Sequence, residues 1–226
     1  MEHKIDIINT DRDHGVLLRA FVLVISLGGA YFALYWLQPL MVDYFRPLLK
    51  IHHKGLSLFF NHVFFYSLPF GLSCFVLRQL LVEMDILSPL GLKVNFVNSL
   101  RDGIVGGLVV IGLFVMIWVA MGKGFKLHMD PYSAAGNIFS NFYEELAYRG
   151  LVFSGLLFSL RWRWLAVVLS GVAFAYTHSS YPFFLQAGVA AAGMVFSVAY
   201  LRTKNLFAPW LAHEFSDVIL DAILKM

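Results

Sequence analysis

Long apolar segments run through almost the whole chain. Crossing the hydrocarbon core of a bilayer as a helix takes about 20 apolar residues. Charged residues make up 14% of the sequence and mean hydropathy is +0.72, whereas a soluble domain is roughly 25% charged. The sequence therefore predicts an all-α polytopic membrane bundle of about seven transmembrane helices, within a range of roughly six to eight. We expect them at residues 16–37, 56–81, 102–121, 132–160, 164–178, 183–201 and 206–224.

The residues between these segments are too few for a second domain, so we expect a single transmembrane domain over residues 1–226. The stretch 83–101 is shorter and more polar than the others, and it contains Pro89-Leu90-Gly91. We expect it to lie at the membrane interface, although a span within it would raise the count to eight. The single cysteine, Cys74, excludes a disulfide framework and a cysteine-based metal site.

Lysine and arginine are spread over short loops and are not clustered. If the chain crosses the membrane seven times, ten of these basic residues lie on the same side as the N-terminus and six on the other side. Arg78 is among the ten. Because cytoplasmic loops carry the excess of basic residues, the N-terminus is predicted to be cytoplasmic. The net charge of +3 fits anchoring to anionic lipid. We therefore expect membrane lipid, and no nucleic acid, as a partner.

Two adjacent carboxylates and an arginine interrupt the apolar segment 132–160, within residues 141–150. Ionisable groups at membrane depth are costly and are functional by default. At about 100° per residue of helix, several polar side chains fall within about 60° of Glu144, forming a stripe that must face the bundle interior or a wet cavity. They are Ser133, Asn137, Ser140, Asn141 and Tyr148.

Glu145 points about 100° away from Glu144. It precedes Arg149 by four residues, which is the favourable order for a helical ion pair. We therefore predict that Glu145 pairs with Arg149 and fixes the helix, while Glu144 faces the cavity. The alternative is that all three groups only hold helices together.

Possible partners of Glu144 lie on later segments. His178 ends segment 164–178, and His213 precedes Asp217 by four residues on segment 206–224. Each has a structural explanation, since a histidine is favoured at a helix C-terminus and a His–Asp pair can satisfy itself in a core. That explanation weakens because two histidines and a glutamate then lie on three separate membrane helices.

Glu144-Glu145-x-x-x-Arg149, Phe174-x-x-x-His178 and His213-x-x-x-Asp217 resemble, in order, the three motifs of the CAAX prenyl protease and bacteriocin-processing family. Each motif is short, but all three in order on apolar helices are specific. The resemblance covers residue 137 to the C-terminus. It implies scaffold helices over 16–131 and a catalytic core over 132–226.

The resemblance implies a metal-independent, glutamate-type intramembrane endopeptidase in which Glu144 activates a water molecule and His178 assists. His213 and residue 217 would stabilise the oxyanion. Eukaryotic-type CAAX proteases have asparagine where this chain has Asp217, and an ionised aspartate only accepts hydrogen bonds. We therefore assign the oxyanion contact to His213, oriented by Asp217. The residues expected to support the site are Glu145, Arg149, Asn141, Tyr148 and Phe174.

The expected substrate is a protein or peptide with a membrane-proximal, lipidated or hydrophobic C-terminal segment, cleaved near that segment without a cofactor. The expected location is the cell membrane, as a multi-pass protein of a prokaryotic inner or plasma membrane. Three alternatives stay open. One is a non-catalytic scaffold or immunity protein of the same family, and another is a proton-coupled transporter. The third is a zinc protease with Glu144, His178, His213 and Asp217 as ligands.

Overall fold

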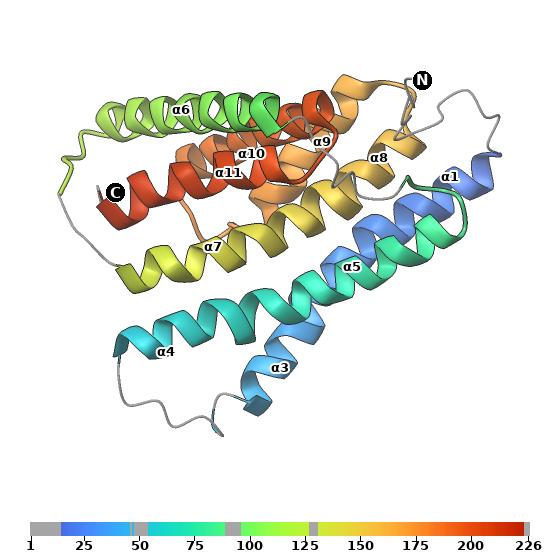
Figure 1. The fold of residues 1–226 in the computed structure, drawn as a ribbon, viewed down its shortest axis with the longest axis horizontal. Coiled ribbons are helices and arrows are strands. Elements are labelled where there is room, and N and C mark those ends of the chain that lie inside the picture. Colours follow the sequence, from blue (N-terminus) through green and yellow to red (C-terminus); the bar gives the residue numbers. More distant parts are fainter. Residues whose placement is uncertain (1–14, 46, 48–53, 89–95, 127–130, 224–226) are drawn as a thin grey trace.

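The computed structural model of the chain describes residues 15–45, 47, 54–88, 96–126 and 131–223. In this part of the chain there are seven continuous helices and no strand, which confirms the predicted all-α bundle (Figure 1). The first two helices alternate between α-helical and π-helical segments. They consist of α1 (Val16–Leu23), η1 (Val24–Gly28), α2 (Gly29–Phe32), η2 (Ala33–Leu37) and α3 (Gln38–Phe45), then α4 (Lys54–Phe60), η4 (Asn61–Ser67) and α5 (Leu68–Glu83).

The remaining five helices carry the small-residue faces and the polar motifs. They are α6 (Phe96–Ala120); α7 (Pro131–Glu145) continuing through η5 (Leu146–Phe153) and α8 (Ser154–Ser159); α9 (Arg163–Tyr176); α10 (Phe183–Thr203); and α11 (Phe207–Asp217) continuing through η6 (Val218–Ile223). The structure differs in part from the interfacial stretch predicted at 83–101. Residues 96–101 are the first residues of the long helix α6, and residues 89–95 lie outside the described part.

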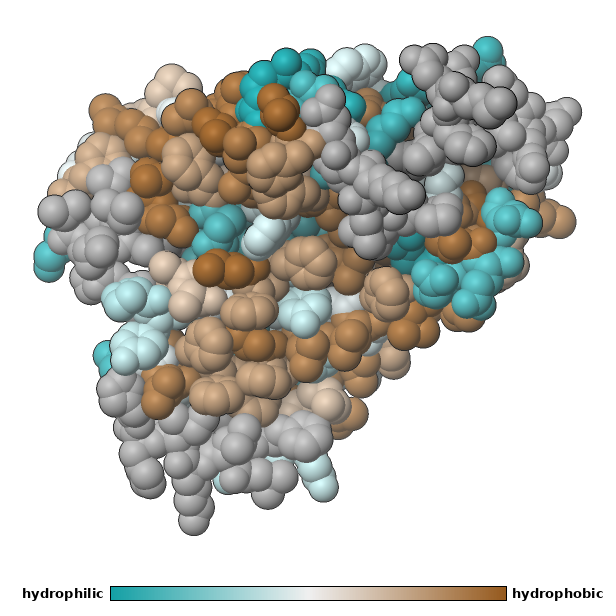
Figure 2. All heavy atoms as spheres, in the orientation of Figure 1, coloured by the Kyte–Doolittle hydropathy of each residue, from teal (hydrophilic) through white to brown (hydrophobic). Residues whose placement is uncertain are grey.

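Four of these helices are long and apolar enough to cross a membrane: Val16–Tyr44, Lys54–Glu83, Phe96–Ala120 and Phe183–Thr203. Large hydrophobic side chains are exposed on them, and hydrophobic residues cover much of the face drawn in Figure 2. The chain is therefore a membrane protein. The other three helices are shorter or more polar, and helix 131–159 contains Glu144, Glu145 and Arg149. The total of about seven spans stays a prediction.

The helix formed by α7, η5 and α8 lies in the middle of the bundle. On one side it contacts α4, η4 and α5, and on the other α9, α10 and α11. Figure 1 shows this helix running between the layer of α6, α10 and α11 and the layer of α4 and α5. The polar motif of the sequence is therefore surrounded by other helices and not by lipid, as its cost at membrane depth requires.

Glycines allow the closest helix crossings. A Cβ atom at Gly107 of α6 would lie 3.1 Å from the Ala212 backbone oxygen of α11, and one at Gly171 of α9 would lie 2.5 Å from the Ala190 backbone oxygen of α10. A Cβ atom at Gly193 of α10 would lie 3.0 Å from the Cα atom of Gly171. These small residues therefore lie at close helix crossings. Such crossings bring backbone against backbone where side chains would separate the helices.

Gly171→Ala should destabilise the protein by about 1–3 kcal/mol, because the new methyl meets a backbone oxygen that cannot move aside. The change in unfolding free energy is measurable by denaturation in detergent micelles. Gly112→Ala on α6 is the matched control, since a Cβ there meets nothing within 4 Å. Alanine in an exposed helix interior is favoured over glycine by roughly 0.5–1 kcal/mol. Equal effects of the two substitutions would contradict the close crossing.

Arg78 lies in α5, within the predicted helix 56–81, but its side chain is only 2% exposed. We counted it among the basic residues on the N-terminal side of the membrane. Because it is inside the bundle, it does not contribute to the charge bias between the two membrane faces. The predicted orientation then rests on nine basic residues against six.

Candidate active site

A cavity of about 760 Å³ lies inside the bundle. All four residues predicted to be catalytic line it: Glu144 from α7, His178 from the turn after α9, and His213 and Asp217 from α11. The predicted supporting residues Asn141, Tyr148 and Phe174 line it as well. Helices 16–45, 54–83 and 96–120 close the other side with side chains such as Gln38, His62 and Trp118.

The two adjacent glutamates have different environments. Glu144 lines the cavity, whereas the Glu145 side chain is fully buried. Arg149 Nη1 donates to Glu145 Oε1 at 3.0 Å, and Arg149 Nη2 donates to the Gly193 backbone oxygen at 2.9 Å. The predicted Glu145–Arg149 pair is confirmed, and it joins the central helix to α10.

His213 is held by Glu145 more closely than by Asp217. Its Nδ1 lies 2.9 Å from Glu145 Oε1, and its Nε2 lies 3.5 Å from Asp217 Oδ2. Because a carboxylate only accepts, Nδ1 carries a hydrogen and donates it to Glu145. Asp217 lies beside Nε2, and its role in orienting the imidazole stays a prediction. The structure adds Glu145 as a second carboxylate, which accepts from the other ring nitrogen. The i,i+4 spacing identified Asp217, but a partner on another helix has no sequence signal.

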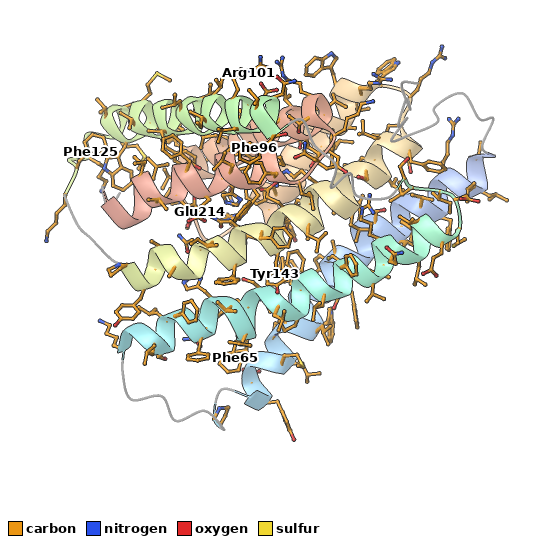
Figure 3. All side chains as sticks on the ribbon, viewed as in Figure 1. Phe65, Phe96, Arg101, Phe125, Tyr143 and Glu214 are labelled. Carbon is orange, nitrogen blue, oxygen red and sulfur yellow. The ribbon has the colours of Figure 1, made fainter. Side chains whose placement is uncertain are left out.

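Asn141 connects α7 to the two carboxylates of α11. Its Nδ2 donates to Asp217 Oδ2 at 2.9 Å and to Glu214 Oε2 at 3.1 Å. Figure 3 shows Glu214 between α11 and α7, the two helices that this contact joins. Both hydrogens of the amide are therefore used to hold carboxylates. Asn141 fixes Asp217 in place, and Glu214 is a member of this network that the sequence reading did not assign.

His178 lies in the turn that follows α9, two residues past the end of the helix at Tyr176. Its Nδ1 is 3.1 Å from the Phe174 backbone oxygen, which also accepts from Thr177 Oγ1 at 2.7 Å. A carbonyl only accepts, so Nδ1 carries the hydrogen and a neutral ring has Nε2 as its acceptor. The Gln186 side chain donates to the His178 backbone oxygen at 3.3 Å and holds the turn.

Two phenylalanines pack the histidines and the arginine together. The Phe174 ring centroid is 5.6 Å from that of His213 and 5.1 Å from that of His178. Phe196 of α10 stacks on His213 at 4.8 Å with an interplanar angle of 25°. Arg149 Cζ lies 4.9 Å from the Phe174 centroid and 5.2 Å from that of Phe196. Phe196 was missed because an aromatic residue on an apolar helix has no distinguishing pattern.

The fold and the cavity define a membrane protein in which carboxylates and histidines converge from separate helices. Residues 131–219 match the model of a protein family described as Rce1-like, type II CAAX prenyl endopeptidase Rce1-like. This confirms the predicted resemblance to the CAAX prenyl protease and bacteriocin-processing family for the segment that holds all three motifs. The match spans fewer than half of the residues. No curated protein and no solved structure matches the chain.

Proposed function

We propose that the chain is a metal-independent, glutamate-type intramembrane endopeptidase. The matched family implies CAAX-type intramembrane endopeptidase activity. The observation that supports a glutamate-type mechanism is the shared cavity, where Glu144 lines the same space as His178, His213 and Asp217. Glu145 and Arg149 form a fully buried pair, so a single carboxylate of the motif remains for chemistry.

In the proposed mechanism, Glu144 takes a proton from a water molecule as the water oxygen adds to the scissile carbonyl carbon. A carboxylate within hydrogen-bond reach of water serves as such a general base. The tetrahedral intermediate then loses the amine, which receives a proton from the Glu144 carboxyl. The C–N bond breaks, and the products are a carboxylate and an amine.

We assign to His213 the stabilisation of the oxyanion that develops on the substrate. The Nδ1 hydrogen of His213 is committed to Glu145, so the donor toward the cavity is Nε2–H of the doubly protonated ring. One preorganised donor of this kind contributes about 3 kcal/mol to transition-state stabilisation. Asp217 lies beside Nε2 and is itself held by Asn141. The assignment gives Asp217 the role of positioning and balancing the charge of this imidazole.

His178 is assigned to assist Glu144. The bond from its Nδ1 to the Phe174 backbone oxygen fixes the ring and makes Nε2 the acceptor of the neutral form. Such a nitrogen orients the attacking water and relays its proton. Glu144 and His178 would then share the proton transfer from the attacking water.

The proposed substrate is a protein or peptide with a membrane-proximal, lipidated or hydrophobic C-terminal segment. Polar catalytic groups form one wall of the cavity, while apolar side chains such as Phe114, Trp118 and Leu185 form other parts. A volume of about 760 Å³ lies in the range of small-ligand sites, roughly 300–1,000 Å³, and suits a few residues of peptide. The proposed location is a prokaryotic plasma membrane, with membrane lipid as the surrounding partner.

Zinc catalysis by the same residues is the competing proposal. Among the described residues, no three His, Cys, Asp or Glu side chains are grouped as a metal site requires. Both nitrogens of His213 face carboxylates, which supports a hydrogen-bonding role for this ring. Full activity in a strong chelator, with no stoichiometric zinc by elemental analysis, is the result expected for the metal-independent enzyme.

The experiment that tests the proposed function is a comparison of membrane-protein C-termini in cells with the wild-type chain and with Glu144→Ala. We expect a set of C-termini that is trimmed only with the wild type. Glu83→Ala is the control, since Glu83 is exposed at the end of α5. Identical C-termini in all three strains would refute cellular proteolysis by this chain.

Phe196→Leu should lower kcat for cleavage by up to about tenfold, because an aromatic contact contributes about 0.5–1.5 kcal/mol and His213 loses its stacked ring. Phe158→Leu is the matched control. Phe158 is also buried, but it lies on α8 and does not line the cavity. Both substitutions should destabilise the fold to a similar extent. A comparable fall in kcat for Phe158→Leu would show that the effect is not specific to His213.

A further inference from the structure

Arg78 is a buried cation outside the segment that matches the family. It lies on α5, its side chain is 2% exposed, and it is among the largest fully buried side chains of the described residues. A guanidinium at membrane depth is costly and is retained where it has a function. The mechanism proposed above makes no use of it.

The contacts of Arg78 are to neutral oxygens. Its Nε donates to the Gly150 backbone oxygen at 2.6 Å, and its Nη2 donates to the Ser88 backbone oxygen at 2.7 Å. The ion pairs found within the described ranges do not include Arg78. Hydrogen bonds from a charged donor are about twice as strong as neutral ones. Arg78 therefore acts on backbone position and not on the charge of a carboxylate.

The carbonyl that Arg78 holds lies in η5, the π-helical segment that begins directly after Glu145. A π-helical turn changes the hydrogen-bond register from i+4 to i+5 and is frequent at functional sites. Two backbone oxygens in the middle of η5 accept from side chains: Arg149 O from Ser154 Oγ at 2.8 Å and Gly150 O from Arg78. A Cβ at Gly150 would lie 3.5 Å from Arg78 Cδ, an ordinary van der Waals contact, so the Arg78 side chain packs directly against the backbone of this segment.

We propose that Arg78 is a positioning residue that locks η5 and thereby sets the geometry of the Glu144–Glu145–Arg149 motif. The inference rests on the proposed function for its catalytic consequence. Tyr148 and Arg149 lie within η5, and Glu145 joins Arg149 to His213. A shift of this turn moves the motif relative to the imidazole. The N-terminal helices are therefore part of the catalytic apparatus through Arg78.

The test combines hydrogen–deuterium exchange with steady-state kinetics on Arg78→Gln, Arg78→Lys and the control Arg163→Gln, all in lipid nanodiscs. Arg163 is exposed at the start of α9. With Arg78→Gln, we expect exchange across residues 146–153 to rise at least about tenfold, as for loss of a charged hydrogen-bond donor. A misplacement near 1 Å costs about 100-fold in rate, so kcat should fall by about that factor while KM stays within about twofold.

Arg78→Lys retains a cationic donor and should recover most of the protection and a kcat within about tenfold of the wild type. If Arg78→Gln is not recovered as a folded protein, Arg78→Lys alone provides the test. In that case, an Arg78→Lys variant that exchanges as slowly as the wild type but has a kcat reduced 100-fold would overturn the proposal. Unchanged exchange across residues 146–153 in Arg78→Gln would overturn it as well. So would lost protection with an unchanged kcat. If the chain is not a protease, the wild type will cleave nothing. The exchange data would then still show whether Arg78 holds η5 in place.

Discussion

Glu144→Gln should lower kcat for peptide cleavage by about 10³-fold, within the range attributed to a general base. The substitution keeps the shape of the side chain and removes its ability to take a proton. Glu144 lines the cavity and is not part of the buried ion pair, so folding should not suffer. Thermal stability in detergent should therefore stay close to that of the wild type. Initial rates with a CAAX peptide, measured at saturation, give the comparison.

Glu83→Gln is the matched control for this result, since Glu83 is exposed and does not line the cavity. We expect its kcat to equal that of the wild type. Retained cleavage by Glu144→Gln would refute the role of Glu144. Loss of cleavage together with loss of the folded protein would assign Glu144 to structure instead.

Arg149→Met should have the largest effect on stability, about 3–5 kcal/mol, because it leaves a buried carboxylate without its cation. The side chains of Arg149 and Glu145 are both fully buried. Arg149 also donates to the Gly193 backbone oxygen and lies over two phenylalanine rings. The loss is measurable as a change in unfolding free energy in mixed micelles.

The double substitution Glu145→Leu with Arg149→Met separates stability from activity. Replacing both members of a buried pair by apolar side chains is often neutral or stabilising, so much of the stability should return. Activity should not return, because His213 Nδ1 loses its acceptor Glu145. Recovery of both would show that the pair only holds helices together. Recovery of neither would contradict the view that an unpaired charge causes the destabilisation.

Local patterns in the sequence predicted much of the fold. Apolar length predicted where the helices lie, because hydrocarbon permits no other open backbone structure. The rotation of 100° per residue separated Glu144 from Glu145, because side-chain direction on one helix depends only on that helix.

Local sequence patterns did not predict the contacts between side chains on different helices. His213 is oriented by Glu145 on α7, and nothing near residue 213 indicates this. Arg78 is a basic residue near the end of an apolar segment, and its contact with Gly150 becomes apparent only when α5 packs against η5. The catalytic assignments of Glu144, His178, His213 and Asp217 stay predictions. Their common cavity supports them and the experiments above test them.

The most direct test of the proposed protease is mass spectrometry of a CAAX peptide incubated in H₂¹⁸O with the purified protein in nanodiscs. The prenylated and unprenylated forms of the same peptide should be compared. The wild type is expected to release a shortened peptide whose new carboxylate carries one ¹⁸O, and Glu144→Gln is expected to release none. Intact peptide after incubation with the wild type, or equal cleavage by Glu144→Gln, would contradict peptide hydrolysis by a water that Glu144 activates.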